Sequence, residues 1–129
     1  MSEFETVPLP ARPDATAPDG SDVRLLPGLA GGGMAHFQLA AGRTSAAVVH
    51  RTVEELWFFV GGLGEMWRRQ GDREEVVTVA PGVAVSIPVG TSFQFRALGT
   101  EPLAAVAVTM PPWPGPDEAV AVDGPWAPG

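Results

Sequence analysis

The sequence contains no cysteine and no lysine, and its 129 residues include only two histidines. Without cysteine there is neither a disulfide framework nor thiol chemistry. No apolar run approaches the length needed to cross a bilayer. A signal peptide would show a charged start, an apolar core and a cleavage site, and we find no such pattern. We therefore expect a cytoplasmic protein.

Charge excludes two classes of partner. All eight basic residues are arginine, against 15 acidic residues, and the net charge is −7. Nucleic acids and anionic membrane surfaces both require a basic face on the protein. We therefore expect neither a nucleic-acid partner nor a membrane partner.

The pattern of apolar residues predicts an all-β protein. A chain of this length is large enough for one domain with one core. No long stretch carries the i, i+3, i+4, i+7 spacing of an amphipathic helix. Instead, about nine to ten short strands alternate with Gly- and Pro-rich turns, which is typical of a sandwich or barrel.

Composition divides the chain into three parts. Residues 23–110 carry the strands of the predicted barrel. Residues 1–22 have the composition of a flexible tail, with the alternative that Phe4, Val7 and Leu9 lie along a sheet edge, either of this chain or of a partner subunit. Residues 111–129, rich in Pro and Trp, are expected to pack on the barrel, because the prolines prevent a helix or strand interior.

The stretch 42–62 contains the strongest functional signal. Read with a period of two, His50 shares a strand face with Val48, and Glu55 shares one with Trp57 and Phe59. If both faces point inward, an imidazole and a carboxylate meet in an apolar interior. Such polar groups are costly to bury without partners, so we expect His50 and Glu55 to pair.

Two further strands bear on this interior. In Ser92–Ala97, Phe93 and Phe95 share one face. In Met34–Ala40, His36 and Phe37 lie on opposite faces of the strand, and two interpretations of which face points inward remain open. His36 faces solvent while Phe37 faces the core, or it reaches the same interior as His50.

The spacing in these stretches resembles the two signatures of the cupin family. Gly42, His50, Glu55 and Gly62 fall on the first signature, and Val48 stands where its first histidine would be. Gly82, Pro88 and Gly90 fall on the second signature, with Phe93 at the position of its histidine and Ala97 at that of its asparagine.

The resemblance implies a small single-domain cupin, an all-β double-stranded β-helix or jelly-roll barrel. It also implies a divalent transition metal held by three histidines and a glutamate. Here only His50 and Glu55 match that set, and His36 is the candidate that could complete it. We therefore expect either one such metal or none.

Three functions are consistent with these residues. The first is a protein that binds or transforms a small, largely apolar molecule in the barrel, with His50 as general base, Glu55 as its partner and the aromatic residues as pocket walls. Such an enzyme would be of lyase, isomerase or cyclase type. The second is a metal-dependent dioxygenase or isomerase, and the third a non-catalytic binding module. The resemblance also implies a homodimer. The pocket residues expected are Val48, Trp57, Phe59, Phe93 and Phe95.

Overall fold

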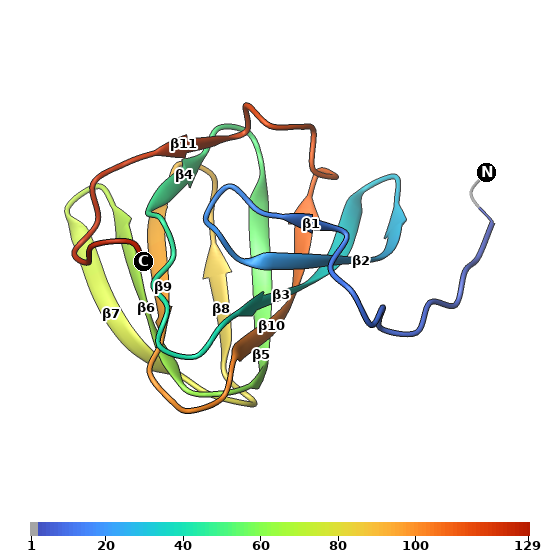
Figure 1. Ribbon diagram of the computed structural model, residues 1–129. Helices are drawn as coiled ribbons and strands as arrows, with labels where there is room; N and C mark the ends of the chain where they lie inside the picture. The colour runs from blue at the N-terminus through green and yellow to red at the C-terminus, as the bar shows by residue number, and fades with distance from the viewer. Residues whose placement is uncertain (1–2) are drawn as a thin grey trace.

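The computed structural model describes residues 3–129, and all regular structure in this range is β-strand (Figure 1). This confirms the predicted fold class. The described residues contain no helix that could cross a membrane. The strands are β1 (Ala15–Thr16), β2 (Asp22–Leu29), β3 (Gly32–Leu39), β4 (Val48–His50), β5 (Glu54–Gly61), β6 (Gly64–Gln70), β7 (Arg73–Val79), β8 (Ala84–Ile87), β9 (Ser92–Ala97), β10 (Leu103–Met110) and β11 (Ala119–Ala121).

The strands form two antiparallel sheets packed face to face. One has six strands in the order β1-β2-β3-β10-β5-β8, and the other has five in the order β11-β4-β9-β6-β7. Strands that are distant in sequence therefore lie side by side, as β3 and β10 do. In Figure 1 the two sheets enclose the barrel interior, with β6 and β7 on one side and β3, β5 and β10 on the other.

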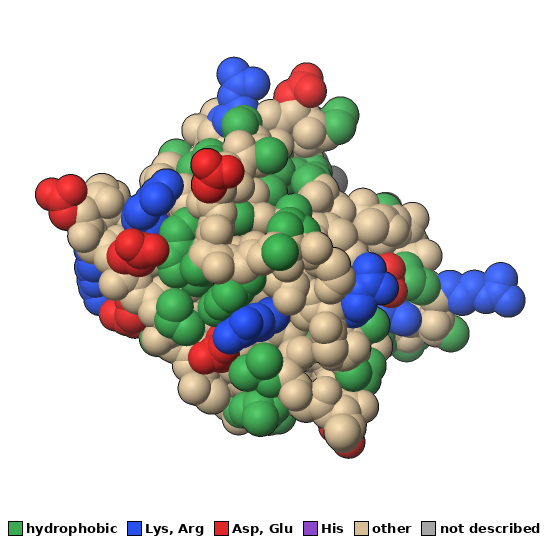
Figure 2. Space-filling model, turned by 60° about the vertical axis from the view of Figure 1, so that its left-hand side comes forward, with side chains coloured by type: hydrophobic (Ala, Val, Ile, Leu, Met, Phe, Trp, Pro, Cys, Tyr) green, Lys and Arg blue, Asp and Glu red, His purple; other side chains and the backbone are tan. Residues whose placement is uncertain are grey.

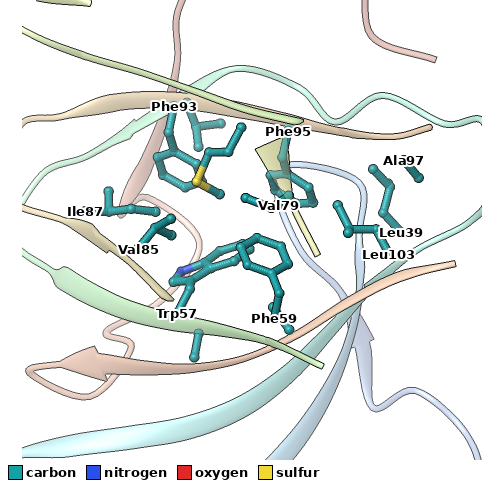
Figure 3. Packing of buried hydrophobic residues seen from close by; sticks show 14 residues of the cluster. Leu39, Trp57, Phe59, Val79, Val85, Ile87, Phe93, Phe95, Ala97 and Leu103 are labelled. Carbon is teal, nitrogen blue, oxygen red and sulfur yellow. The ribbon is translucent and has the colours of Figure 1, made fainter. Parts of the chain in front are cut away.

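Strict alternation along β5 divides its side chains between the interior and the outside. Glu55, Trp57 and Phe59 are buried, and the residues between them are exposed. In Figure 3, Trp57 and Phe59 meet Phe93 and Phe95 from the opposite sheet. Burying one such aromatic side chain removes roughly 150–250 Å² from water. Fully burying a side chain such as Phe stabilises the fold by roughly 1.5–3 kcal/mol relative to leaving it exposed.

Small residues on β10 make room for these rings. Ala105 and Ala107 are fully buried and lie between β3 and β5 in register. Across them, Phe37 and Trp57 stack with ring centroids 5.1 Å apart and planes 2° from parallel. The alanines of β10 therefore let two aromatic side chains cover the middle of the sheet.

The outer faces of the two sheets differ. The C-terminal segment covers part of the five-stranded sheet, where the amide of Gln94 donates to the Trp126 carbonyl and Arg96 lies 4.2 Å from the Trp126 ring. The outer face of the six-stranded sheet instead exposes Leu56 and Phe58. Figure 2 shows another face, where charges of both signs are interspersed with apolar side chains and no histidine is visible.

The N-terminal segment contains two different parts. Residues 3–9 extend away from the barrel (Figure 1), and Phe4 is 100% exposed, whereas the carbonyls of Pro10 and Ala11 accept hydrogen bonds from Arg24 of β2. After them, β1 adds an edge strand beside β2, and the turn at residues 17–21 returns to the barrel. In that turn Asp19 is buried, and its carbonyl accepts a hydrogen bond from the Ala46 amide. The second part is therefore integral to the barrel.

Candidate functional site

His50 and Glu55 lie together in the interior. Nδ1 of His50 is 2.9 Å from Oε1 of Glu55, and the two side chains are 5% and 2% exposed. The two atoms are in close contact, but the geometry does not meet that of a hydrogen bond. The other carboxylate oxygen, Oε2, accepts a hydrogen bond of 3.0 Å from Nε1 of Trp57. The predicted pairing of these residues is thus present in the structure.

Two aromatic rings fix the orientation of the imidazole. Phe93 meets the His50 ring edge-on at 5.2 Å, and Trp113 does so at 5.1 Å. Phe93 follows from the β4–β9 pairing, which places Val48 opposite it. Trp113 comes from the segment after β10. With Nδ1 directed to Glu55, Nε2 is the ring nitrogen left for a bound molecule.

A cavity of about 400 Å³ opens beside this pair. Ligand sites in proteins commonly measure about 300–1,000 Å³ and are mostly apolar with a few polar groups. Leu25, Met34 and Trp113, all partly exposed, lie at its mouth. Apolar side chains dominate its walls, and three titratable residues also line it: Asp19, His50 and Glu55.

Asp19 is the carboxyl that the sequence did not indicate. Its Oδ1 accepts two hydrogen bonds from Ser21, from the amide at 2.9 Å and from the hydroxyl at 2.6 Å. Burial raises the pKa of Asp19 above its ordinary value, and the nearby Glu55 adds to the rise, against the opposing effect of the Ser21 bonds. Desolvation disfavours the charged form of any carboxyl in this way.

Glu118 holds the connection that follows His50. Its carboxylate accepts hydrogen bonds from the Thr52 amide at 2.7 Å, the Thr52 hydroxyl at 2.6 Å and the Val53 amide at 2.9 Å. Burial acts to raise the pKa of Glu118, but these bonds outweigh it and hold the pKa below its ordinary value. Glu118 is therefore an anionic clamp on the chain between β4 and β5.

The structure separates the predicted pocket residues into two groups. Val48, Trp57 and Phe93 line the cavity beside His50 and Glu55. Phe59 and Phe95 do not line it; they are 1% and 2% exposed and belong to the apolar core deeper in the barrel. They support the cavity indirectly, since the Trp57 ring packs against both.

His36 lies away from the cavity. Its neighbours Ala35 and Phe37 line the cavity, and alternation along β3 places His36 on the other face, opposite Arg24 of β2 and Val106 of β10. It is nevertheless buried, and its Nδ1 has no hydrogen-bond partner among the described residues. The structure therefore does not bring His36 together with His50 and Glu55.

Several cavity residues were missed at the level of sequence. Asp19 lies in a segment whose composition resembles a tail. Trp113 was expected to pack on the barrel, but not to contact the central histidine. Phe37 faces the core in one of the two interpretations of its strand, and that alternation is the signal for its position in the wall. Thr109, the last residue but one of β10, adds a hydroxyl.

The donor set does not fit a resident metal ion. Among residues 3–129, no three His, Asp or Glu side chains gather closely enough to hold one. Apolar Val48 and Phe93 occupy two further positions of the metal-binding signatures. His36, the candidate replacement, faces the other way. We therefore derive no step of the chemistry through a metal.

Comparisons with known proteins were made for both sequence and structure. No family model matches the sequence, and no curated protein matches it. Similar solved structures are numerous. An uncharacterised conserved protein with a double-stranded β-helix domain from Klebsiella pneumoniae matches with a TM-score of 0.65 and 18% identity, over 88% of this chain and 90% of its own.

Two of the similar structures are of named proteins. Oxalate decarboxylase from Bacillus subtilis has a TM-score of 0.70 and 14% identity over 83% of this chain, but the match spans 29% of the decarboxylase chain. KdgF from Halomonas sp. has a TM-score of 0.63 and 16% identity, over 71% of this chain and 79% of its own. At this level of identity the likeness shows the fold. The fold is the double-stranded β-helix of cupin-type proteins.

Proposed function

We propose that this protein is a small single-domain cupin that binds and transforms a small, largely apolar organic molecule in its cavity, with His50 as general base and Glu55 as its partner. The observation that carries the proposal is the buried contact between His50 and Glu55, with 2.9 Å between Nδ1 and Oε1, at the wall of a mostly apolar cavity.

The cavity limits the size of the ligand. If each non-hydrogen atom occupies about the 30 Å³ of a liquid water molecule, the cavity of about 400 Å³ holds roughly a dozen such atoms. The wall contains the rings of Phe37, Trp57, Phe93 and Trp113. A compact, flat and largely apolar molecule therefore suits it better than a sugar or a phosphate ester.

The pair suits proton transfer. Glu55 lies 2.9 Å from Nδ1 of His50, which leaves Nε2 to act as the base, and Trp57 donates a hydrogen bond to the second oxygen of Glu55. A positioned base of this kind commonly accelerates a reaction by about 10²–10⁴-fold. The reaction types that need proton transfer without a further reagent are elimination, isomerisation and cyclisation, so we assign the activity to a lyase, isomerase or cyclase.

The test is a screen of bicyclic and monocyclic aromatic compounds by thermal stabilisation. A binder should raise the melting temperature of the native protein. Ala35→Phe, which fills the cavity from β3, should abolish the rise. His50→Gln separates the catalytic from the binding interpretation. If the variant still binds a compound that the native protein converts but no longer converts it, His50 is supported as the general base. Unchanged conversion by the variant would contradict that role.

We also propose that the chain forms a homodimer through the outer face of the six-stranded sheet. Three exposed apolar side chains follow one another on β5, namely Leu56 (54%), Phe58 (50%) and Val60 (45%). The N-terminal arm, residues 3–10, is extended, and its apolar side chains are exposed (Figure 1). Eight extended residues span roughly 26 Å, enough to cross about five strands of a partner's sheet.

A further inference from the structure

The cavity contains a titratable group that the proposed general base leaves unused. Asp19 is 7% exposed and lines the same space as His50 and Glu55. It comes from the turn after β1, whereas the other two come from β4 and β5. A carboxyl so placed in an apolar cavity needs an explanation beyond packing, because burying it is costly.

The backbone around Asp19 holds its carboxyl in place. Ala17 donates its amide to the Ser21 carbonyl at 2.8 Å and accepts from the Gly20 amide at 2.9 Å, which closes the turn. The Asp19 carbonyl accepts from the Ala46 amide at 2.8 Å, which joins the turn to the chain just before β4. The carboxyl is thus fixed relative to the strand that carries His50.

The two oxygens of Asp19 have different surroundings. Oδ1 accepts both hydrogen bonds from Ser21, which is itself completely buried. Oδ2 is therefore the oxygen available to a molecule in the cavity. Burial raises the pKa of this carboxyl, with a smaller rise from Glu55, while the two hydrogen bonds from Ser21 and, to a lesser extent, His50 lower it. A carboxyl whose pKa is raised holds its proton more readily, and in its protonated form it can donate a hydrogen bond to a ligand oxygen.

We propose that Asp19 is the catalytic acid that works with the base His50, and that the cavity takes ketones bearing a C–H bond next to the carbonyl. This inference rests on the proposed function and adds the substrate class to it. A base on one wall and a fixed acid on another are the two groups that enolisation requires.

Two protons move in this step. Nε2 of His50 removes the proton from the carbon next to the carbonyl, and the electrons of that C–H bond form the carbon–carbon double bond. The carbonyl π electrons move to the oxygen, which takes the proton from Oδ2 of Asp19. The products are an enol, an imidazolium and a carboxylate, and the reverse step returns a proton to carbon.

A purely structural role for Asp19 makes a different prediction. Its bond to the Ser21 amide is that of an Asx turn, which positions a chain without any chemistry. Asp19→Asn retains an Oδ1 acceptor for Ser21 and is neutral, but an amide does not transfer a proton. The substitution should therefore leave the melting temperature nearly unchanged while removing the acid.

The experiment uses tetralone in D₂O. Tetralone is a bicyclic aryl ketone with about as many non-hydrogen atoms as the cavity holds, roughly a dozen. Deuterium incorporation beside the carbonyl is followed by proton NMR for the native chain, Asp19→Asn and His50→Gln. The native chain should exceed buffer, and each variant should lose about 10²-fold or more of the exchange rate. Infrared spectra at neutral pH should show a protonated-carboxyl band that Asp19→Asn lacks.

The outcomes separate this inference from the proposed function. Exchange that depends on His50 but is equal in Asp19→Asn overturns the role of Asp19 and leaves the base in place. Saturable binding of tetralone without exchange overturns the ketone chemistry and leaves the cavity as a binding site. No binding of tetralone overturns the substrate class, while the wider aromatic screen still decides the proposed function.

Discussion

At the scale of single residues, Glu118 is the clearest link between the C-terminal segment and the cavity. Its side chain accepts three hydrogen bonds from Thr52 and Val53, immediately after His50. Glu118→Ala leaves these donors without their partner, at about 1–3 kcal/mol for each donor that water cannot reach. Chemical denaturation should show the loss, and Asp117→Ala, at an exposed neighbour, is the matched control.

The same carboxylate gives a dependence of stability on pH. Because the pKa of Glu118 is lowered in the folded state, its contribution is present above the ordinary value of 4.5 and is lost as the pH falls through the lower folded value. The stability difference between the native chain and Glu118→Gln should therefore shrink in acid. A difference that stays constant to low pH would contradict this account of the clamp.

His36 makes the opposite face of β3 sensitive to pH. Burial, together with Arg24, lowers the pKa of His36 below its ordinary value of 6.5. The folded state therefore binds this proton less readily than the unfolded state, and stability falls as the pH drops from 6.5 toward the folded pKa. His36→Gln should remove that part of the slope in denaturation curves. A pKa above 6.5 for the His36 imidazole, measured by NMR titration of the folded protein, would contradict this prediction.

Residue patterns also show why part of the site was predictable. The His50–Glu55 pair follows from strand alternation and spacing, because both side chains lie on inner faces. The facing of His36 could not be decided, since His36 is buried although it lies on the outer face. Asp19 was missed because a short turn brings it inward from a segment whose composition resembles a tail.

At the scale of elements, the glycines of the two signatures have a common physical role. Gly42, Gly62, Gly82 and Gly90 all have positive φ, between 77° and 94°. Side chains with a Cβ rarely adopt this conformation. The turns between strands were therefore predictable from sequence, and with them the fold. The strand β11 and the contact of Trp113 with His50 depend on long-range packing, which local patterns do not encode.

One of these glycines also lies against the backbone. A Cβ on Gly62 would collide with the Pro102 carbonyl oxygen and would lie 2.9 Å from the Leu103 Cα, whereas a Cβ on Gly82 would meet nothing within 4 Å. Gly82→Ala should therefore cost only the strain of positive φ, about 1–2 kcal/mol. Gly62→Ala should cost clearly more. Equal losses in thermal denaturation would contradict this packing.

At the scale of the whole molecule, the two outer sheet faces predict the assembly. The C-terminal segment covers part of one outer face, while the other exposes Leu56 and Phe58. Sedimentation should give twice the chain mass of 13.4 kDa. Phe58→Glu should dissociate the dimer, and Phe4→Asp should weaken it.

The control for the dimer lies on the other sheet. Val76 of β7 is 48% exposed, close to the 50% of Phe58. Val76→Glu places the same charge on a strand outside the proposed interface and should leave the mass unchanged. A native chain that sediments as a monomer at micromolar concentration would contradict the proposed assembly.

The central claim is that the cavity beside His50 binds a small apolar molecule. The four tryptophans of the chain allow a direct measurement, because Trp57 and Trp113 line the cavity and Trp67 and Trp126 do not. Titration with tetralone, followed through the four indole N–H resonances, should shift the first two saturably and leave the other two in place. Saturable shifts at Trp67 and Trp126 alone, or no saturable shift at Trp57 and Trp113 with any aromatic probe, would contradict the account.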